Sequence, residues 1–364
     1  MVTKLKKLCS YFLFALRMPF PAVRRSRLAF VELNRIRPNR RLHQVCRLLA
    51  ESGYRCAVRM PFSRFVKLDA YGRAACLDPS ARRASARDRG RAAIVASDDA
   101  RDPVGAAMLR VRYDVFGGDV DPDAALFYPI LFHPDLHDRK HERESEGLYR
   151  ASLARPGERM GVFFAGNCSA PLYDDPETKE RFGLQTRWEL FERIKAGLGP
   201  DELFLPRSYA GLVGAIEAGS LRRKVVLVNT NDFEIPGEEW LSILSKTDFF
   251  IHMPGYVQPF CHNQVESLSV GAVPITEFPR LFRPAFRDGV DCLSFKGPDQ
   301  LIAVLKGAIG GGRSDEAVCA MRERCVRYYA ERLSFDSFSR RLERLVADKG
   351  RRQTDLYICS SGRA

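Results

Sequence analysis

Short runs of apolar residues recur along the chain, and longer polar segments separate them. Each run is three to seven residues long, which suits a buried strand. In the first half, the runs at residues 28–33 and 54–58 flank residues 39–51, whose apolar side chains share one helix face. Residues 91–97 form a further short run, after an Arg- and Ala-rich loop or helix at 81–91. This β-α-β succession predicts a parallel, doubly wound α/β sheet.

The second half repeats the alternation and predicts a second sheet. A long helix is expected at residues 177–198, a short one at 240–244, and two terminal helices at 314–333 and 335–347. No GxGxxG follows the first strand, so the fingerprint of a dinucleotide-binding domain is absent. The strands of this half are expected at residues 160–165, 224–229, 249–251, 272–275 and 291–295.

Residues 248–278 are predicted to form strand, loop, short helix and strand. Pro254-Gly255 breaks the first strand, and the helix runs from Asn263 to Gly271. A helix that begins at the end of a strand presents free N–H groups and its positive dipole end to an anion. Glu266, on its first turn, is placed to accept a hydrogen bond from a sugar hydroxyl beside a phosphate. Asn263 and Glu266 also match a capping box, which needs no ligand and is compatible with the same site.

This segment resembles the donor-binding segment of GT-B glycosyltransferases. The exostosin-like group carries VEALAAG-x-x-P where this chain has VESLSVGAVP at residues 265–274, within a resemblance that spans residues 160–335. It implies two Rossmann-like domains whose parallel sheets face a central cleft, and Glu266 bound to the nucleotide ribose. The group usually has an arginine just before this glutamate, where His262-Asn263-Gln264 stand here.

A second turn carries the same resemblance. The apolar run at residues 160–165 ends in Gly166-Asn167, a small-residue turn that opens the C-terminal domain beside the donor in this group. A cation near that turn would balance the charge of a diphosphate leaving group, and Arg187 is the first choice and Arg181 the second. The expected donor-binding residues are Gly166, Asn167, Arg187, Tyr256, His262, Asn263 and Glu266.

Three of the six histidines, His133, His137 and His141, recur every four residues. With Pro134 at the first helical position they would share one helix face, and such a stripe binds zinc in some proteins. His133 is instead our candidate for the general base. It ends an apolar run where a side chain would face the cleft, and its ordinary pKa suits proton removal near neutral pH. Asp135 is the alternative base, and a histidine that only caps the strand end is the structural alternative. No metal is expected, because GT-B enzymes need none.

The charge is concentrated at the amino end. The chain has a net charge of +13, and residues 1–45 hold eleven Lys or Arg against the single acid Glu32, a net +10. The apolar core at residues 11–16 is far shorter than the ~20 residues of a bilayer span, and no small-residue cleavage site follows it. An interfacial helix over residues 5–20 on an anionic membrane face is expected, with a helix packed on the domain, or a mobile leader, as alternatives. No nucleic-acid motif accompanies the basic arm.

Ten scattered cysteines without a CxxC pair indicate a reducing compartment. The expected setting is cytoplasmic, peripheral on the inner face of the membrane. The expected parts are an arm at residues 1–25, an acceptor-side domain at 26–155, a nucleotide-sugar-binding domain at 156–349 and a loose tail at 350–364.

Together these observations predict a metal-independent glycosyltransferase. It would move a sugar from a nucleotide-diphosphate sugar, its only co-substrate, to a glycan or lipid-linked acceptor. A nucleotide-sugar epimerase on the same fold and a non-catalytic GT-B binding protein are the alternatives. An epimerase would need a pair of carboxylates in the cleft to move a proton on the sugar, and no such pair is evident in the sequence.

Overall fold

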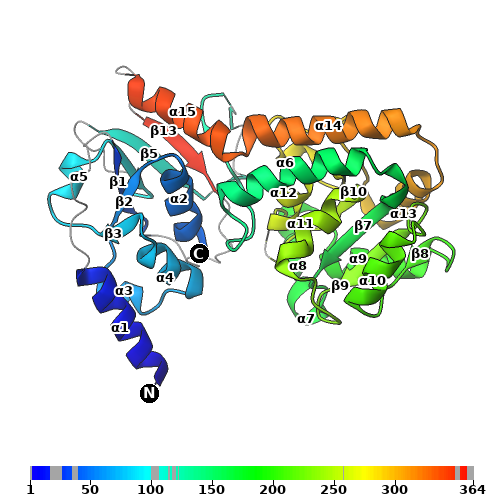
Figure 1. Ribbon diagram of the computed structural model, residues 1–364, viewed down its shortest axis with the longest axis horizontal. Helices are drawn as coiled ribbons and strands as arrows, with labels where there is room; N and C mark the ends of the chain where they lie inside the picture. Colours follow the sequence, from blue (N-terminus) through cyan, green and yellow to red (C-terminus); the bar gives the residue numbers. More distant parts are fainter. Residues whose placement is uncertain are drawn as a thin grey trace. The chain divides into compact units, whose positions relative to one another are not determined.

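The computed structural model describes residues 2–16, 27–34, 40–99, 106–113, 115–116, 120–121, 123–256, 258–348 and 353–358. The chain forms two compact units (Figure 1). Unit 1 comprises Met1–Arg139 and Arg332–Ala364, and unit 2 comprises Lys140–Glu331. The chain thus passes from one unit to the other at residues 139/140 and 331/332. We expected the second domain to begin at residue 156 and to end at residue 349.

Unit 1 is built on a seven-stranded sheet in the order β3-β2-β1-β4-β5-β13-β6. Every described strand pairing in it is parallel. The strands are β1 (Leu28–Glu32), β2 (Arg55–Val58), β3 (Ala81–Arg83), β4 (Ile94–Ser97), β5 (Ala107–Arg112), β6 (Leu126–Phe127) and β13 (Gln353–Tyr357). The helices are α1 (Val2–Leu16), α2 (Arg40–Glu51), α3 (Phe62–Phe65), α4 (Ala70–Leu77), α5 (Asp88–Arg91) and α15 (Phe335–Ala347).

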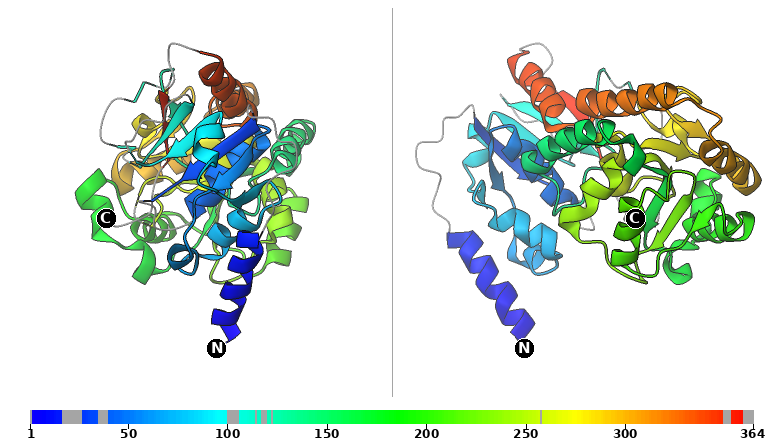
Figure 2. Two further views of the ribbon diagram at one scale, coloured as in Figure 1. Left: turned by 90° about the vertical axis from the view of Figure 1, so that its left-hand side faces the viewer. Right: turned by 45° about the vertical axis from the view of Figure 1, so that its right-hand side comes forward.

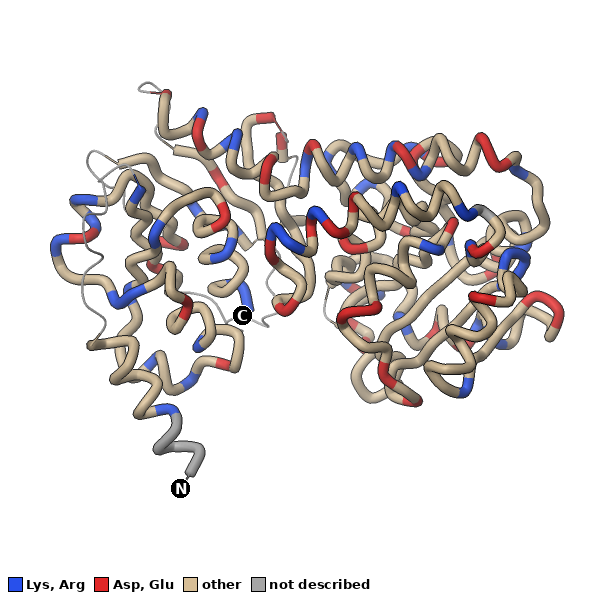
Figure 3. Tube along the Cα trace, viewed as in Figure 1, with Lys and Arg blue, Asp and Glu red and all other residues tan. Residues whose placement is uncertain are grey.

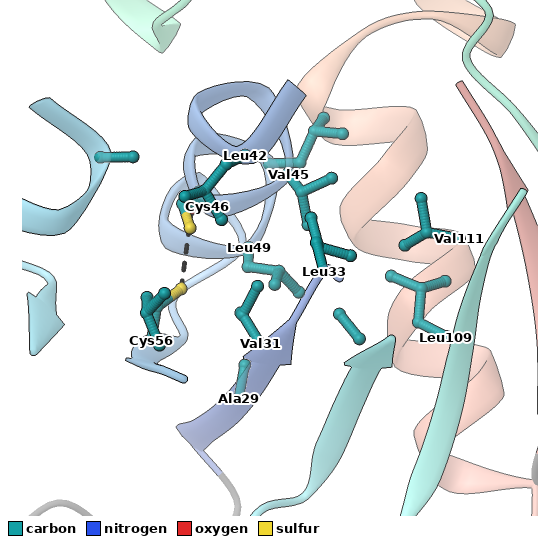
Figure 4. Close-up of a cluster of buried hydrophobic side chains, with 14 of the residues drawn as sticks. Ala29, Val31, Leu33, Leu42, Val45, Cys46, Leu49, Cys56, Leu109 and Val111 are labelled. Atoms are coloured by element: carbon teal, nitrogen blue, oxygen red, sulfur yellow. Dashed lines mark hydrogen bonds between the residues drawn. The ribbon is translucent and has the colours of Figure 1, made fainter. Parts of the chain in front are cut away.

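Both faces of this sheet are buried, which explains its uninterrupted apolar strands. Along β1, Ala29 and Val31 point into a large core that includes α2 and α15, whereas Leu28 and Phe30 point into a smaller one. The larger core is shown in Figure 4, where the thiols of Cys46 and Cys56 lie against each other. The nine cysteines that the structure describes are free thiols.

Unit 2 is built on a six-stranded sheet in the order β12-β11-β10-β7-β9-β8, and its described pairings are also parallel. The strands are β7 (Met160–Gly166), β8 (Leu203–Phe204), β9 (Val225–Asn229), β10 (Thr247–His252), β11 (Val273–Thr276) and β12 (Leu293–Ser294). The helices are α6 (Arg139–Leu153), which starts one residue before the unit, α7 (Ala170–Tyr173), α8 (Pro176–Phe182), α9 (Arg187–Gly197), α10 (Tyr209–Glu217), α11 (Gly237–Ser245), α12 (His262–Ser269), α13 (Gly297–Ile309) and α14 (Asp315–Arg332), with 3-10 turns η2 (Pro156–Glu158) and η3 (Pro279–Leu281).

These two sheets confirm the predicted fold class, α/β with two domains on parallel sheets. The chain also returns to unit 1 at its end. The helix α14 belongs to unit 2, whereas α15 and β13 belong to unit 1. The strands of unit 1 are therefore supplied by both ends of the sequence.

Three local expectations were wrong. The tail expected at residues 350–364 contains β13, which pairs with both β5 and β6 inside the sheet. The segment expected as a loop or helix at 81–91 begins with β3, paired with β2, and only its end at Asp88–Arg91 is helical. The single helix expected at 177–198 is split into α8 and α9, because Gly183 takes a left-handed φ of 64°.

The amino-terminal segment forms α1, which projects from the rest of unit 1 in both views of Figure 2. The part of its predicted range at residues 17–25 lies outside the described residues. Within the described residues, no helix is long and apolar enough to cross a membrane.

Candidate active site

The sheet of unit 2 has a topological switch point between β7 and β10. The chain passes from β7 outward to β8 and β9 on one side, then returns across β7 to build β10, β11 and β12 on the other. In open parallel sheets, ligands bind outside the carboxyl ends of the strands at such a reversal. The residues that follow β7 and β10 are therefore the first place to look for a site.

Arg187 joins these two strand ends. Its Nε donates to the carbonyl of Pro254 at 2.8 Å, and its Nη1 donates to the carbonyl of Asn167 at 3.1 Å. The guanidinium also lies 4.1 Å from the centroid of the Tyr173 ring. At 5% exposure, Arg187 is a fixed positive charge at the switch point. Arg181, the second choice, is instead an exposed side chain paired with Glu177.

Gly166 and Asn167 form the predicted turn after β7. A Cβ at Gly166 would lie 3.1 Å from the Phe164 ring and 3.3 Å from Arg187 Nη1, so a larger residue would displace the arginine. The side-chain oxygen of Asn167 accepts from the backbone of Ser169 at 2.9 Å and from Nδ2 of Asn231 at 2.9 Å. This turn is tied to the loop after β9, and both predicted residues lie beside Arg187.

The helix α12 begins at the same place. Its N-cap residue is Cys261, and no side chain caps this end. Asn263 lies inside the helix, donates from Nδ2 to the carbonyl of Ala165 at 3.3 Å and accepts from the Cys261 thiol at 2.5 Å. The predicted capping box between Asn263 and Glu266 is therefore absent. The side chain of Cys261 therefore does not offset the positive dipole end of α12.

Glu266 does not face this loop. Its side chain is 0% exposed, and Nε1 of Trp240 donates to its Oε2 at 2.7 Å. His262 Nδ1 lies 3.1 Å from the same oxygen. The structure thus contradicts the predicted direct contact between Glu266 and a ribose, because the packing of α11 against α12 directs the acid inward. The carboxylate instead orients the His262 ring.

Two of the predicted donor-binding side chains are accessible. His262 has a side-chain exposure of 38%, and Tyr256 is 41% exposed. The Glu266 carboxylate lies against Nδ1 of His262, so Nε2 is on the side of the ring away from the carboxylate. Tyr256 lies edge-on to Tyr173, with ring centroids 6.3 Å apart, and Tyr173 in turn covers Arg187. The pair of Tyr173 and Tyr256 therefore lies beside the Arg187 guanidinium.

Buried polar residues hold the loop that carries Tyr256. Gln264 Nε2 donates to the carbonyls of Met253 and Pro259, at 3.1 and 3.0 Å. His252 is completely buried, its Nε2 is 3.1 Å from the Ser267 hydroxyl, and burial lowers its pKa to about 3. It is neutral and structural. Burial likewise raises the pKa of the Cys261 thiol to about 11, against the opposing charge of Arg187.

In unit 1, the two predicted base candidates lie together. His133 Nδ1 is 3.4 Å from Asp135 Oδ2, and its Nε2 is 3.4 Å from the Tyr71 hydroxyl. Tyr71 also donates to Asp135 at 3.3 Å, and burial raises the pKa of this phenol. These are long hydrogen bonds, and the His133 side chain is 27% exposed. The cluster can accept a proton from a hydroxyl group placed against it.

The predicted histidine stripe does not form. The helix α6 begins at Arg139, so only His141 of the three is helical, and His133 and His137 lie in the preceding segment. The strand β6 ends at Phe127, so His133 does not directly follow a strand as expected. His137 is buried against the Phe335 ring, and this burial lowers its pKa well below the ordinary value. Among residues that the structure describes, no group of three or more His, Cys, Asp or Glu is placed to hold a metal ion.

Comparison with known proteins gives structural similarity only. No family model matches the chain, and no curated protein matches its sequence. The fold is similar to Anabaena HepE in complex with UDP, with a TM-score of 0.44 and 9% identity over 88% of this chain and 99% of that one. It is also similar to a glycosyltransferase from Rickettsia africae (TM-score 0.46, 10% identity, 88% and 97% covered). A third similar structure is WaaG, a glycosyltransferase of lipopolysaccharide biosynthesis (0.40, 11%, 89% and 100%).

The sequence reasoning missed several residues at these sites. Tyr71, Tyr173 and Trp240 carry no motif, and only the folded chain brings them to His133, Arg187 and Glu266. Asp98 had a detectable signal, because it directly follows the apolar strand β4. Its carboxylate accepts from the backbone of Asn34 at 2.6 Å and from the Tyr113 hydroxyl at 3.1 Å, and so joins the carboxyl ends of β1 and β4.

Proposed function

We propose that this protein is a GT-B glycosyltransferase that moves a sugar from a nucleotide-diphosphate sugar to a glycan or lipid-linked acceptor. The observation that carries the proposal is the switch point of unit 2. There a buried arginine, an uncapped helix end and two accessible ring side chains gather outside the strands.

The diphosphate is assigned to the amino end of α12 and Arg187. Backbone N–H groups and the helix dipole favour negative charge there. Arg187 is already fixed by two carbonyls and the Tyr173 ring, so it need not reorganise as charge develops on the departing diphosphate. These groups supply positive charge without a metal ion, so we expect turnover to be unchanged by a chelator.

We assign the nucleobase of the donor to Tyr256, and an oxygen of its ribose or phosphate to His262. The exposed Tyr256 ring offers a surface on which a base can stack, in the same way as aromatic side chains hold bases elsewhere. His262 Nε2 can accept from a ribose hydroxyl, or donate to a phosphate oxygen when the ring carries a second proton. Glu266 acts through His262, by holding the ring, and is therefore a positioning residue.

The acceptor is assigned to unit 1, where His133 would serve as the base in an inverting reaction. The acceptor oxygen bonds to the anomeric carbon while the bond between that carbon and the diphosphate oxygen breaks. The hydroxyl proton passes to His133, and Asp135 and Tyr71 stabilise the imidazolium that forms. Assembly of surface polysaccharide or glycolipid at the cytoplasmic face of a membrane is the proposed setting.

A thermal-shift screen against UDP-, GDP-, ADP- and CMP-sugars tests the donor assignment. One nucleotide class should raise Tm, and Tyr256→Ala and His262→Ala should each weaken that donor about tenfold, the cost of one lost stacking or charged contact. Leu205→Ala, which changes an equally exposed side chain elsewhere in unit 2, should bind as the wild type does. Unaltered donor affinity in both site variants would contradict the assignment.

Product analysis with the stabilising donor then separates the alternatives. Transfer to an added acceptor supports the proposal, and it should be lost in His133→Ala while donor binding is kept. Conversion of the donor sugar without an acceptor would indicate an epimerase. Binding without any product would indicate a non-catalytic protein on the same fold.

A further inference from the structure

One face of α1 exposes large apolar side chains. Leu8 is 37% exposed, Phe12 52%, Leu13 65% and Leu16 74%. Residues 8, 12 and 16 follow the four-residue spacing of one helix stripe, and residue 13 lies beside it. We call these four residues the outer face of α1. Half of the large apolar side chains exposed in the described chain lie on this one helix.

The opposite face of α1 is fixed to unit 1. Phe14 is completely buried and stacks on Phe65, with ring centroids 5.8 Å apart. Tyr11 packs edge-on to Phe62 and Phe65, at 4.9 and 5.2 Å. Lys7 Nζ donates to the carbonyl of Val66 at 2.8 Å. The helix is therefore packed on the domain, and this packing determines which side chains remain outside.

Basic residues outnumber acidic ones in α1 and in the segment next to it. The helix α1 carries three lysines and no acid. The segment at residues 59–73, which includes α3 and the start of α4, holds four Lys or Arg and one acid. Figure 3 shows a basic position on the coloured part of α1 and others on the neighbouring segment. Phe62, at the start of α3, is 43% exposed and extends the apolar surface from α1.

We propose that the outer face of α1, together with Phe62, binds the surface of an anionic lipid bilayer. Apolar side chains flanked by basic residues enter the boundary between headgroups and acyl chains, and the Lys and Arg side chains bind acidic lipid headgroups. A helix needs about 20 residues to span the apolar core of a bilayer. The helix α1 has 15 residues, so it is too short to cross and would lie along the surface. This goes beyond the proposed transfer reaction and does not depend on it. Because Tyr11 and Phe14 anchor α1, binding would also fix the orientation of unit 1 on the membrane.

Vesicle sedimentation with the full-length protein tests this. The protein should bind vesicles that contain phosphatidylglycerol, and bind pure phosphatidylcholine at least about tenfold more weakly. The double substitution Phe12→Glu and Leu16→Glu should reduce binding to the acidic vesicles by at least about tenfold. Leu205→Glu, at an exposed leucine of unit 2, is the matched control and should bind as the wild type does. Circular dichroism should show all variants folded, since none of these side chains is buried.

Equal binding by the outer-face variant and the control would overturn the proposal. So would a dimer in sedimentation velocity that dissociates with Phe12→Glu, without any vesicle binding, because the face would then contact a second copy. Deletion of α1 is a poorer test, since it would uncover Phe65 and destabilise unit 1. Donor binding is measured in the same samples, so that a failure of the transferase proposal is distinguished from a failure of this one.

Discussion

At the scale of single residues, burial decides what each histidine does. His252 and His137 are buried in the two units, and desolvation lowers the pKa of each. Burial also lowers the pKa of His43 to about 4, with Arg47 adding to the effect. His133 and His262 are partly exposed and have carboxylates beside them. The first group is neutral and structural, and the second is placed to meet a ligand.

The buried His252 should make the protein sensitive to acid. It binds a proton near pH 6.5 when unfolded but only near pH 3 when folded, so its contribution to stability is lost as pH falls through that window. As the pH falls from about 7.5 to about 5, the proton uptake of His252 in the unfolded chain lowers the unfolding free energy by about 2 kcal/mol. His252→Gln should lower stability at neutral pH yet show a pH dependence smaller by that amount in urea unfolding. An identical pH dependence in both proteins would show that His252 is not the group concerned.

At the scale of elements, helix ends are set by a few backbone positions. The helix α8 stops at Gly183, whose φ is 64°, and α9 starts with a capping box between Thr186 and Glu189. Helical periodicity continues across this junction, which is why a single helix was expected. The break brings Arg187 to the first position of α9, from which it reaches Asn167 and Pro254. The interruption therefore helps to build the candidate site.

Two glycine substitutions should have opposite effects on stability. Gly147 is within α6, with no atom within 4 Å of an added Cβ, so Gly147→Ala should raise the unfolding free energy by about 0.5–1 kcal/mol. Gly183→Ala must adopt a left-handed conformation and should lower it by about 1–2 kcal/mol. Urea unfolding of both variants gives the comparison. Equal changes in one direction would contradict the assigned backbone conformations.

At the scale of the whole molecule, the end of the chain completes the unit in which the chain begins. β13 lies between β5 and β6, Leu356 and Ile358 are completely buried, and Arg110 pairs with Asp355 at 2.9 Å. The helix α15 adds Phe338 and Leu342 to the larger core of unit 1. Unit 1 therefore cannot complete its sheet until the rest of the chain has been made.

Truncation of the chain before β13 should destabilise unit 1 and leave the stability of unit 2 unchanged. Removal of residues 353–364 takes away β13 and should lower the melting temperature of unit 1 by several degrees or prevent its folding, because an interior strand and two buried side chains are lost. Removal of residues 359–364 alone keeps β13 and serves as the control. Hydrogen exchange should then show unit 1 exchanging faster while β7 and β10 of unit 2 stay protected. Equal protection of both units in the longer deletion would contradict the role of β13.

The sequence by itself determined the alternation of strands and helices, and with it two parallel sheets, because buried strands and amphipathic helices leave local apolar patterns. It also identified the turn at Gly166-Asn167 and the helix after β10, since small residues and strand ends mark such sites. Only the tertiary structure decided where side chains point. It turned Glu266 inward to Trp240, placed Tyr71 on His133, Tyr173 on Arg187, and β13 inside the first sheet. Each of these depends on which distant segment packs against the residue, and no local pattern encodes that contact.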